Sequence, residues 1–375
     1  MDIPIHGQCD PRFEAVKTAF ERNFTEHGDL GASVAITLDG EFVVDLWGGH
    51  LDEDRSQPWQ EDTLVNVWSS TKTMAAMSLL LLADRGAVDL HAPAGKYWPE
   101  FAQNGKKDIE VRHFLSHSAG LSGMDKKVDG DALYDWEWMT KALAEQEPWW
   151  KPGSQSGYHA ITQGHLIGEI VRRVTGQTIG NFFRQEIAEP TGADFHIGAD
   201  AALDERIANL VPPPSRPSPP SDSIAGRTFA NPSVDATDPR KRAWRAAEIP
   251  AANGQGNARS IVRAQTAMAN GGEAFGKTIL SEAGTRRIFD KQTDGVDLVL
   301  GLPLTFGMGY GLNNPAMPLS PNTNTAFWGG YGGSSVIVDQ DARLCFSYVM
   351  NKMESGLVGD PRGFGLAAAM YMAMQ

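Results

Sequence analysis

The chain has only two cysteines, Cys9 and Cys345, among its 375 residues. Two thiols provide no disulfide framework, so we interpret both as structural thiols of a reduced, cytoplasmic protein. Long hydrophobic runs are also missing, since the longest, around residues 74–83, is far too short to span a bilayer. The segment from Met1 to His6 is neither basic nor apolar, which predicts that no signal peptide is present.

Positive charge is in deficit. The 33 Lys and Arg residues are outnumbered by 46 Asp and Glu residues, which gives a formal net charge of −13. Such a balance argues against nucleic acid or an anionic membrane as a partner. No Gly-rich phosphate loop and no nucleotide motif is present, so we expect no cofactor. His113 and His117 are spaced as two metal ligands can be, but no third ligand is evident. We therefore interpret them as structural histidines and expect no metal.

A Gly-x-Ser-x-Gly motif is absent as well. None surrounds Ser118, Ser122, Ser156 or Ser334. This motif places the nucleophilic serine of α/β-hydrolases on a sharp strand-to-helix turn. The sequence therefore argues against an esterase of that fold.

Residues 68–86 predict one buried helix. Hydroxyl side chains at Ser69, Ser70 and Thr71 are typical of a helix start, and Gly86 is typical of a helix end. The residues between are apolar on nearly every face, which is typical of a helix inside a core. Lys72 is the single ionisable residue between positions 63 and 83. A lone lysine in such a run is costly unless it has partners or a function.

The spacing of Ser69 and Lys72 suggests that function. Residues three apart lie on one face of a helix, here at its positive end. Lys72 can then accept the Ser69 proton, while the helix N-terminus stabilises developing negative charge. Ser-x-x-Lys is a motif of serine β-lactamases and penicillin-binding proteins, but four residues alone recur by chance. The alternative is that Ser69 caps the helix and Lys72 extends to the surface.

The chain predicts strands at both ends and helices between them. Together they suggest an α+β protein with an antiparallel sheet, flanking terminal helices, a helical insertion and an active site at the seam. Six prolines in 211–220 predict an extended loop, and we interpret the irregular tract to 242 as a pocket wall rather than a linker. The expected strands are 31–38, 41–47, 325–330, 334–339 and 344–350; the expected helices include 10–28, 111–116, 165–174, 259–269 and 364–374; the expected division is 1–85, 86–245 and 246–375.

Taken together, these motifs resemble those of a known superfamily. Ser69-Ser70-Thr71-Lys72 lies on the predicted buried helix, Tyr158 follows on a loop, and Trp328-Gly329-Gly330 opens a late strand. This order resembles the serine β-lactamase and penicillin-binding-protein superfamily, particularly class C β-lactamases and family VIII carboxylesterases. The resemblance extends over nearly all of the chain and includes residues 111–121 and 249–254. It implies a β-lactamase-like fold.

The resemblance also implies roles for individual residues. Ser69 matches the acylated nucleophile of the family, Lys72 its partner, and Tyr158 a general base or proton relay. The backbone N–H groups of Ser69 and Tyr331 match the oxyanion hole. Trp328, Gly329, Gly330, Trp149 and Trp150 are the expected substrate-binding residues.

Two departures from the β-lactamase pattern favour an esterase. Tyr158-His159-Ala160 lacks the asparagine of the second β-lactamase motif, and Trp328 replaces the lysine of the third. We therefore expect a carboxylesterase acting on small neutral esters through a Ser69 acyl-enzyme. The alternatives are an acyltransferase or weak β-lactam or amide hydrolase using the same site, and a non-catalytic binding protein.

Overall fold

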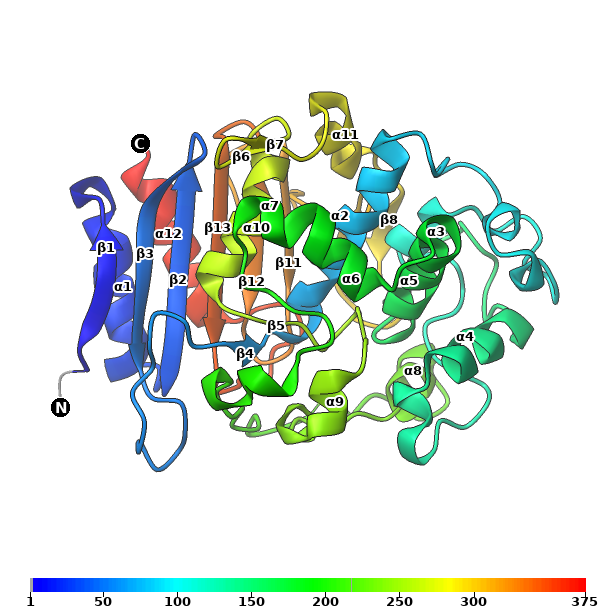
Figure 1. Ribbon diagram of the computed structural model, residues 1–375, viewed down its shortest axis with the longest axis horizontal. Helices are drawn as coiled ribbons and strands as arrows, with labels where there is room; N and C mark the ends of the chain where they lie inside the picture. Colours follow the sequence, from blue (N-terminus) through cyan, green and yellow to red (C-terminus); the bar gives the residue numbers. More distant parts are fainter. Residues whose placement is uncertain (1–2, 217) are drawn as a thin grey trace.

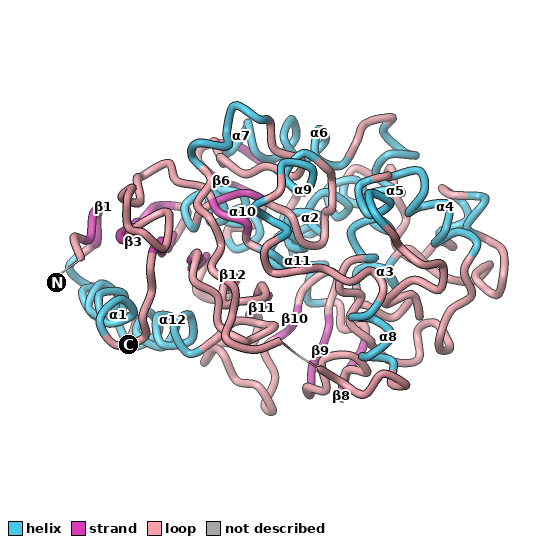
Figure 2. The backbone as a smooth tube through the Cα atoms, turned by 90° about the horizontal axis from the view of Figure 1, so that it is seen from below, coloured by secondary structure: helices cyan, strands magenta, loops and turns pink. Residues whose placement is uncertain are grey.

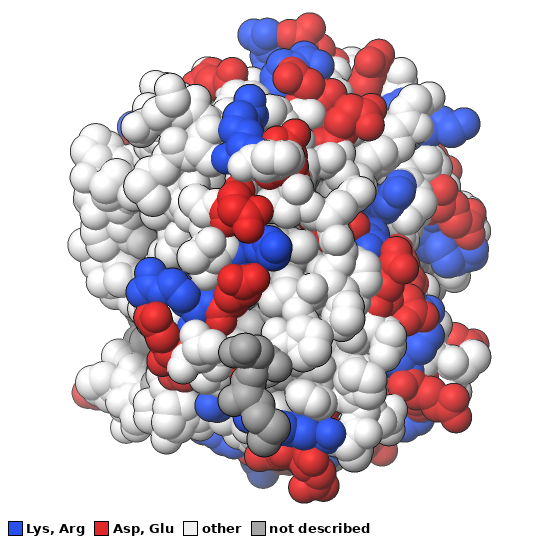
Figure 3. All heavy atoms as spheres, turned by 90° about the vertical axis from the view of Figure 1, so that its left-hand side faces the viewer, with Lys and Arg blue, Asp and Glu red and all other residues white. Residues whose placement is uncertain are grey.

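The computed structural model describes residues 3–216 and 218–375. Met1 and Asp2, the first residues of the segment that predicts no signal peptide, lie outside these ranges. Pro217 of the proline run lies outside them too. Within them, no helix combines the length and the apolar character needed to cross a membrane. Acidic and basic side chains are interspersed on the end of the molecule at strand β1 (Figure 3), so the negative net charge does not form a single patch there.

A nine-stranded antiparallel sheet forms the framework (Figure 1). Its order, β1-β3-β2-β13-β12-β11-β10-β9-β8, places the N-terminal strands beside the C-terminal ones. At the centre β2 pairs with β13 in the register Val34 opposite Tyr348. The strands are β1 Ile5–Cys9, β2 Gly31–Leu38, β3 Glu41–Gly49, β8 Thr293–Val296, β9 Pro303–Phe306, β10 Gly311–Leu312, β11 Thr325–Gly329, β12 Ser335–Asp339 and β13 Leu344–Met350.

Helices cover both faces of this sheet. Helices α1 (Glu14–Thr25) and α12 (Pro361–Ala373) pack together on one face, and α10 (Ala258–Ala269) packs against β2, β12 and β13 on the other (Figure 2). The central strands β2, β11, β12 and β13 are consequently buried almost throughout, as expected for a sheet covered on both sides. This confirms the predicted α+β fold with a sheet built from both ends of the chain. The expected division at residues 85 and 245 stays a prediction.

Most of the remaining helices lie toward the β8 end of the sheet (Figure 1). Helix α2 (Thr71–Asp84) lies between the sheet and this group and packs against α5 and α6. The other helices are α3 Arg112–Leu115, α4 Trp136–Glu145, α5 Thr162–Thr175, α6 Ile179–Phe183, α7 Glu189–Thr191, α8 Ile224–Ala230, α9 Arg242–Ala246 and α11 Glu282–Arg286; two small sheets pair β4 Val65–Asn66 with β5 Gln255–Gly256 and β6 Glu273–Ala274 with β7 Lys277–Thr278.

Local sequence signals explain which elements were predicted correctly. Asp39 and Gly40 both have positive φ, 51° and 86°, as a tight hairpin turn between β2 and β3 requires. Strand β1 was missed because it is short and largely exposed. Strands β8–β10 were missed because they have only two to four residues, with glycine in β8 and β10 and proline at the start of β9. The prediction of an irregular tract up to residue 242 was wrong in part, since α8 lies within it and begins at a Ser223 cap.

Candidate active site

The candidate nucleophile lies in a 3-10 turn, Trp68–Ser70, directly before α2. Trp68 has a φ of +47°, a left-handed conformation that is costly for a bulky residue and is concentrated at functional sites. The predicted hydroxyl caps were wrong. Ser70 Oγ instead bonds Ser334 Oγ at 2.9 Å, and Thr71 Oγ1 donates to the Trp68 carbonyl. The Ser69 hydroxyl likewise makes no capping hydrogen bond to the start of the helix.

Lys72 is buried and reaches three oxygen atoms. Its Nζ lies 3.2 Å from Ser69 Oγ, 2.7 Å from the Ala160 carbonyl and 2.8 Å from the Ala251 carbonyl. Among the described residues no carboxylate forms an ion pair with it. Burial without a counter-charge disfavours the ammonium form, so the pKa of Lys72 is lowered well below its usual value. The alternative interpretation required the Lys72 side chain to extend to the surface. The structure contradicts it, because the side chain is buried.

Tyr158 completes the arrangement from the opposite side. Its hydroxyl donates to Ser69 Oγ at 2.5 Å, and burial raises its pKa, so it stays a phenol. Its backbone N–H donates to Asp297 Oδ1 at 3.0 Å, which fixes the loop that carries it. Its ring packs against those of His117 and Trp328, with centroids 4.9 and 5.4 Å away. The structure therefore brings together the three residues that the sequence singled out.

The turn between β11 and β12 lies against the nucleophile. A Cβ on Gly330 would stand 3.2 Å from the Ser69 nitrogen and overlap Ser334 Oγ and the Val67 carbonyl, so only glycine fits. Ser334 Oγ donates to that Val67 carbonyl at 2.8 Å, which joins the turn to the nucleophile segment. Across the described residues, no protein acceptor engages the N–H of Ser69 or of Tyr331. These are the two donors expected to form the oxyanion hole.

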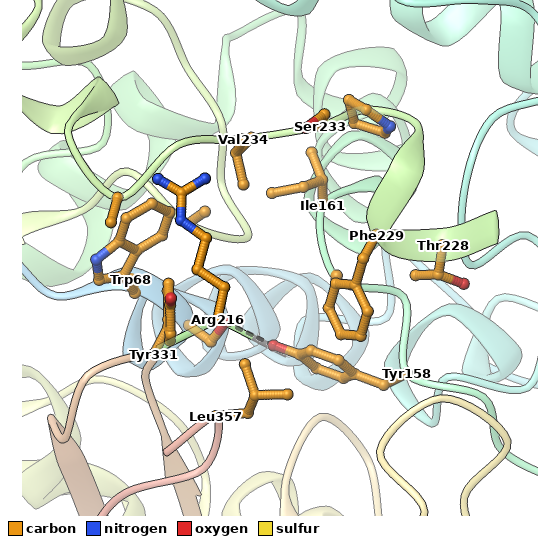
Figure 4. A pocket seen from close by; sticks show the side chains of 15 residues that line it. Trp68, Tyr158, Ile161, Arg216, Thr228, Phe229, Ser233, Val234, Tyr331 and Leu357 are labelled. Atoms are coloured by element: carbon orange, nitrogen blue, oxygen red, sulfur yellow. Dashed lines mark hydrogen bonds between the residues drawn. The ribbon is translucent and has the colours of Figure 1, made fainter. Parts of the chain in front are cut away.

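A pocket of about 230 Å³ has Ser69 in its lining. Figure 4 shows this pocket from close by. Its walls are largely apolar and aromatic, with Phe229 beside Tyr158 and with Trp68 and Tyr331 opposite. Arg216 is the one charged residue among those that line it, and its guanidinium pairs with Asp235. The lining consists of Trp68, Ser69, Tyr158, Ala160, Ile161, Arg216, Thr228, Phe229, Pro232, Ser233, Val234, Ala236, Ala252, Tyr331 and Leu357.

None of the five expected substrate-binding residues lines this pocket. Trp328 is only 2% exposed, and its indole packs against the Tyr158 ring. Gly329 and Gly330 contribute backbone packed against neighbouring segments. Trp149 stacks under the Arg227 guanidinium at 4.0 Å, and Trp150 packs on the His159 ring at 5.7 Å. The expected role of these five residues in substrate binding stays a prediction that this lining does not support.

Most residues of the lining were not predicted from the sequence. Seven of them lie between positions 216 and 236: Arg216 within the proline run and six in the tract that follows it. The available signal was the length of that tract, which led to its interpretation as a pocket wall but identified no individual residue. Trp68 was also missed, although it directly precedes the nucleophile.

The paired histidines have other roles. His113 Nδ1 accepts from the Glu110 N–H, and His117 Nδ1 accepts from the His159 N–H. In the part of the chain that the structure describes, no group of three His, Cys, Asp or Glu side chains could hold a metal ion. Burial and the nearby His159 and Lys72 lower the pKa of His117 well below its usual value. His117 therefore packs as a neutral ring beneath Tyr158.

Comparison with known proteins identifies the family. The family model described as Beta-lactamase matches residues 19–369. A family VIII carboxylesterase of known structure superposes with a TM-score of 0.94 at 42% identity, over 99% of this chain and 100% of its own. A penicillin-binding protein homolog from Caulobacter crescentus gives 0.93 at 37% identity, over 99% and 100% of the two chains. The esterase/beta-lactamase LipL of Mycobacterium tuberculosis is 36% identical over 96% of this chain and 86% of its own length. The chain therefore belongs to the beta-lactamase family, as a serine hydrolase.

Proposed function

We propose that this carboxylic ester hydrolase cleaves small, uncharged esters through an acyl-enzyme on Ser69. One observation carries the proposal: Ser69 Oγ lies within hydrogen-bonding distance of both Lys72 Nζ and the Tyr158 hydroxyl, at the base of a largely apolar pocket. Relatives described as a carboxylesterase and as an esterase/beta-lactamase support ester hydrolysis.

The hydrogen bonds favour one direction of proton transfer. A neutral lysine has two N–H groups and one lone pair. If the N–H groups donate to the Ala160 and Ala251 carbonyls, the lone pair faces the Ser69 hydroxyl. Ser69 then donates to Lys72 while accepting from Tyr158. The lowered pKa of Lys72 suits a base, and the raised pKa of Tyr158 suits a proton donor.

The reaction follows from these positions. Ser69 Oγ attacks the ester carbonyl carbon and its proton passes to Lys72 Nζ. The N–H groups of Ser69 and Tyr331 stabilise the negative carbonyl oxygen. When the C–O bond to the alcohol breaks, the alkoxide takes the Tyr158 proton, which the Lys72 ammonium replaces. Water then attacks the acyl-enzyme, gives its proton to the same pair, and releases the acid with Ser69 restored.

The pH profile tests these roles. We expect kcat/KM to rise with pH through a group assigned to Lys72, because only the neutral amine accepts the serine proton. We expect no decline up to about pH 10 from Tyr158, because its raised pKa keeps the proton donor present. Rates with a neutral ester at constant ionic strength measure the profile. In Tyr158→Phe, kcat/KM should still rise with pH through the same group. If this rise disappeared in the variant, the assignment of the group to Lys72 would be contradicted.

The pocket favours uncharged substrates. Its only cation, Arg216, is already paired with Asp235, and no lysine stands where a β-lactamase has one for the substrate carboxylate. Placing a carboxylate among Trp68, Phe229 and Leu357 without a free partner costs free energy. The negative net charge adds a weaker, screened repulsion.

We therefore expect kcat/KM for a neutral butyrate ester to exceed that for a cephalosporin by at least about tenfold, about 1.4 kcal/mol. Steady-state rates on both substrates at one ionic strength measure the ratio. Arg216→Gln serves as the control, because a cephalosporin that uses this cation should lose turnover in the variant while the ester does not. Equal or reversed values in the unmodified protein would instead favour the β-lactamase alternative.

Intact-protein mass tests the covalent step itself. The protein is mixed with an activated short-chain ester, a phosphonate or a cephalosporin. We expect one adduct on Ser69, which is short-lived with the ester and persistent with the phosphonate. No adduct on Ser69 would overturn the proposed function.

A further inference from the structure

The turn that carries the Tyr331 N–H has little rigidity of its own. Gly332 and Gly333 both have positive φ, 94° and 130°, and glycine has more backbone freedom than any other residue. Four backbone bonds restrain it: Gly330 N–H donates to the Ser334 carbonyl, Gly333 N–H to the Gly330 carbonyl, Gly332 N–H to the Gly356 carbonyl, and Glu354 N–H to the Gly332 carbonyl. A further restraint on Gly332 comes from a side chain that lies far along the chain.

That side chain is Arg362, in the first turn of α12. Its Nη2 donates to the Gly332 carbonyl at 2.8 Å. Its Nη1 donates to Asp29 Oδ1 at 2.6 Å and to the Lys352 carbonyl at 2.8 Å. Nε and the second Nη2 hydrogen engage Asp360, the N-cap of α12. All five N–H groups are thus used, and the side chain is only 2% exposed.

The glycine turn packs closely against this guanidinium and Asp360. A Cβ on Gly333 would stand 2.2 Å from Asp360 Oδ2 and 2.8 Å from Arg362 Nη2. Tyr348 supports the other side, because its hydroxyl donates to Asp29 Oδ2 at 2.7 Å. Arg362 therefore joins four segments in one network: the N-terminus of α12, Asp29 just before β2, Lys352 just after β13, and the glycine turn.

We propose that Arg362 is a positioning residue that holds the Tyr331 N–H in place for the oxyanion hole through its bond to the Gly332 carbonyl. This rests on the proposed function, in which that N–H stabilises the negative oxygen. A lysine cannot replace it, because three donors on one nitrogen cannot span acceptors on four segments. An arginine that only anchored α12 would need its bonds to Asp360 but not the bond to the Gly332 carbonyl. The bond to Gly332 is therefore the reason to assign Arg362 a role in activity as well as in stability.

Arg362→Lys tests the proposal, with Arg259→Lys as the matched control. Arg259 pairs with Asp45 and Glu61 and makes no contact with the turn. Removing an oxyanion donor costs about 10²–10³ in kcat, so for a displaced donor we expect a loss of about 10- to 100-fold with KM within about twofold. The rate of Ser69 phosphonylation should fall in parallel, because that adduct also places an oxygen in the hole. Arg259→Lys should leave both unchanged.

Asp29→Asn decides the question if Arg362→Lys does not fold. It keeps the guanidinium but weakens one of its partners, so a smaller kcat loss in the same direction is expected. An unchanged kcat in the folded variant, or a change in KM alone, would overturn the proposal. If the protein of native sequence neither hydrolysed esters nor reacted with the phosphonate, the proposed function itself would be overturned. The proposed role of Arg362 in the oxyanion hole would then fall with it.

Discussion

Ser69→Ala is expected to lower kcat for ester hydrolysis by three to six powers of ten, in line with the loss that follows removal of a nucleophile elsewhere, about 10⁶ in one protease. The neighbouring Ser70 is not expected to take its place, because its hydroxyl bonds Ser334. The fold should persist, since the change removes one oxygen at a pocket wall. Steady-state kinetics and the thermal midpoint of unfolding measure the two effects.

Ser78→Ala is the matched control for this experiment. Ser78 is buried in α2, the helix that follows Ser69, and its hydroxyl donates to the Met74 carbonyl at 2.9 Å. It should keep nearly full activity, with a thermal midpoint close to that of Ser69→Ala. A Ser69→Ala variant that retained most of its kcat would show that the nucleophile is another residue.

Lys72→Ala and Tyr158→Phe are each expected to lower kcat by about two to four powers of ten, the range for loss of a general acid or base. The double variant should be within about tenfold of the worse single variant, because residues that act as one proton-transfer unit are not additive. Both hydrogen bonds converge on Ser69 Oγ, so loss of either partner breaks the same path. Steady-state kinetics on one neutral ester measures all three variants.

Lys72→Met separates chemistry from packing in this series. Methionine fills much of the space of the buried lysine but has no amine, so it should be as inactive as Lys72→Ala and more stable. Losses that multiply in the double variant would mean that Lys72 and Tyr158 act independently. That outcome would contradict the shared path even if each single variant were inactive.

The sequence carried enough information for the framework and the chemical centre. The hairpin turn at Asp39-Gly40, the apolar helix after Ser69 and the late strands have strong local signals, and they lie where predicted. Ser69 and Lys72 are close in the chain, so helix geometry alone predicts their contact. Tyr158 is distant in sequence, and only the resemblance to a family suggested its place.

The pocket lining was not predictable in the same way. Trp328 is an aromatic residue next to a glycine motif, which suggested a ligand contact, yet tertiary packing places it behind Tyr158. Phe229 and Val234 line the pocket because α8 and the chain after it fold back over Ser69, and no local pattern encodes that return. Arg362 bears on the turn only through contacts between distant segments.

The pairing of β2 with β13 determines when during biosynthesis the site can exist. The bond from the Gly31 N–H to Asn351 joins residues 320 positions apart. Contacts of such long range form late and slowly, because the closure entropy must be overcome before they contribute. A ribosome completes Ser69 and Lys72 long before it reaches Tyr331 and Arg362. With the proposed roles, the nascent chain carries its nucleophile before its oxyanion hole, and we expect esterase activity to emerge only after the last strand and α12 have left the exit tunnel.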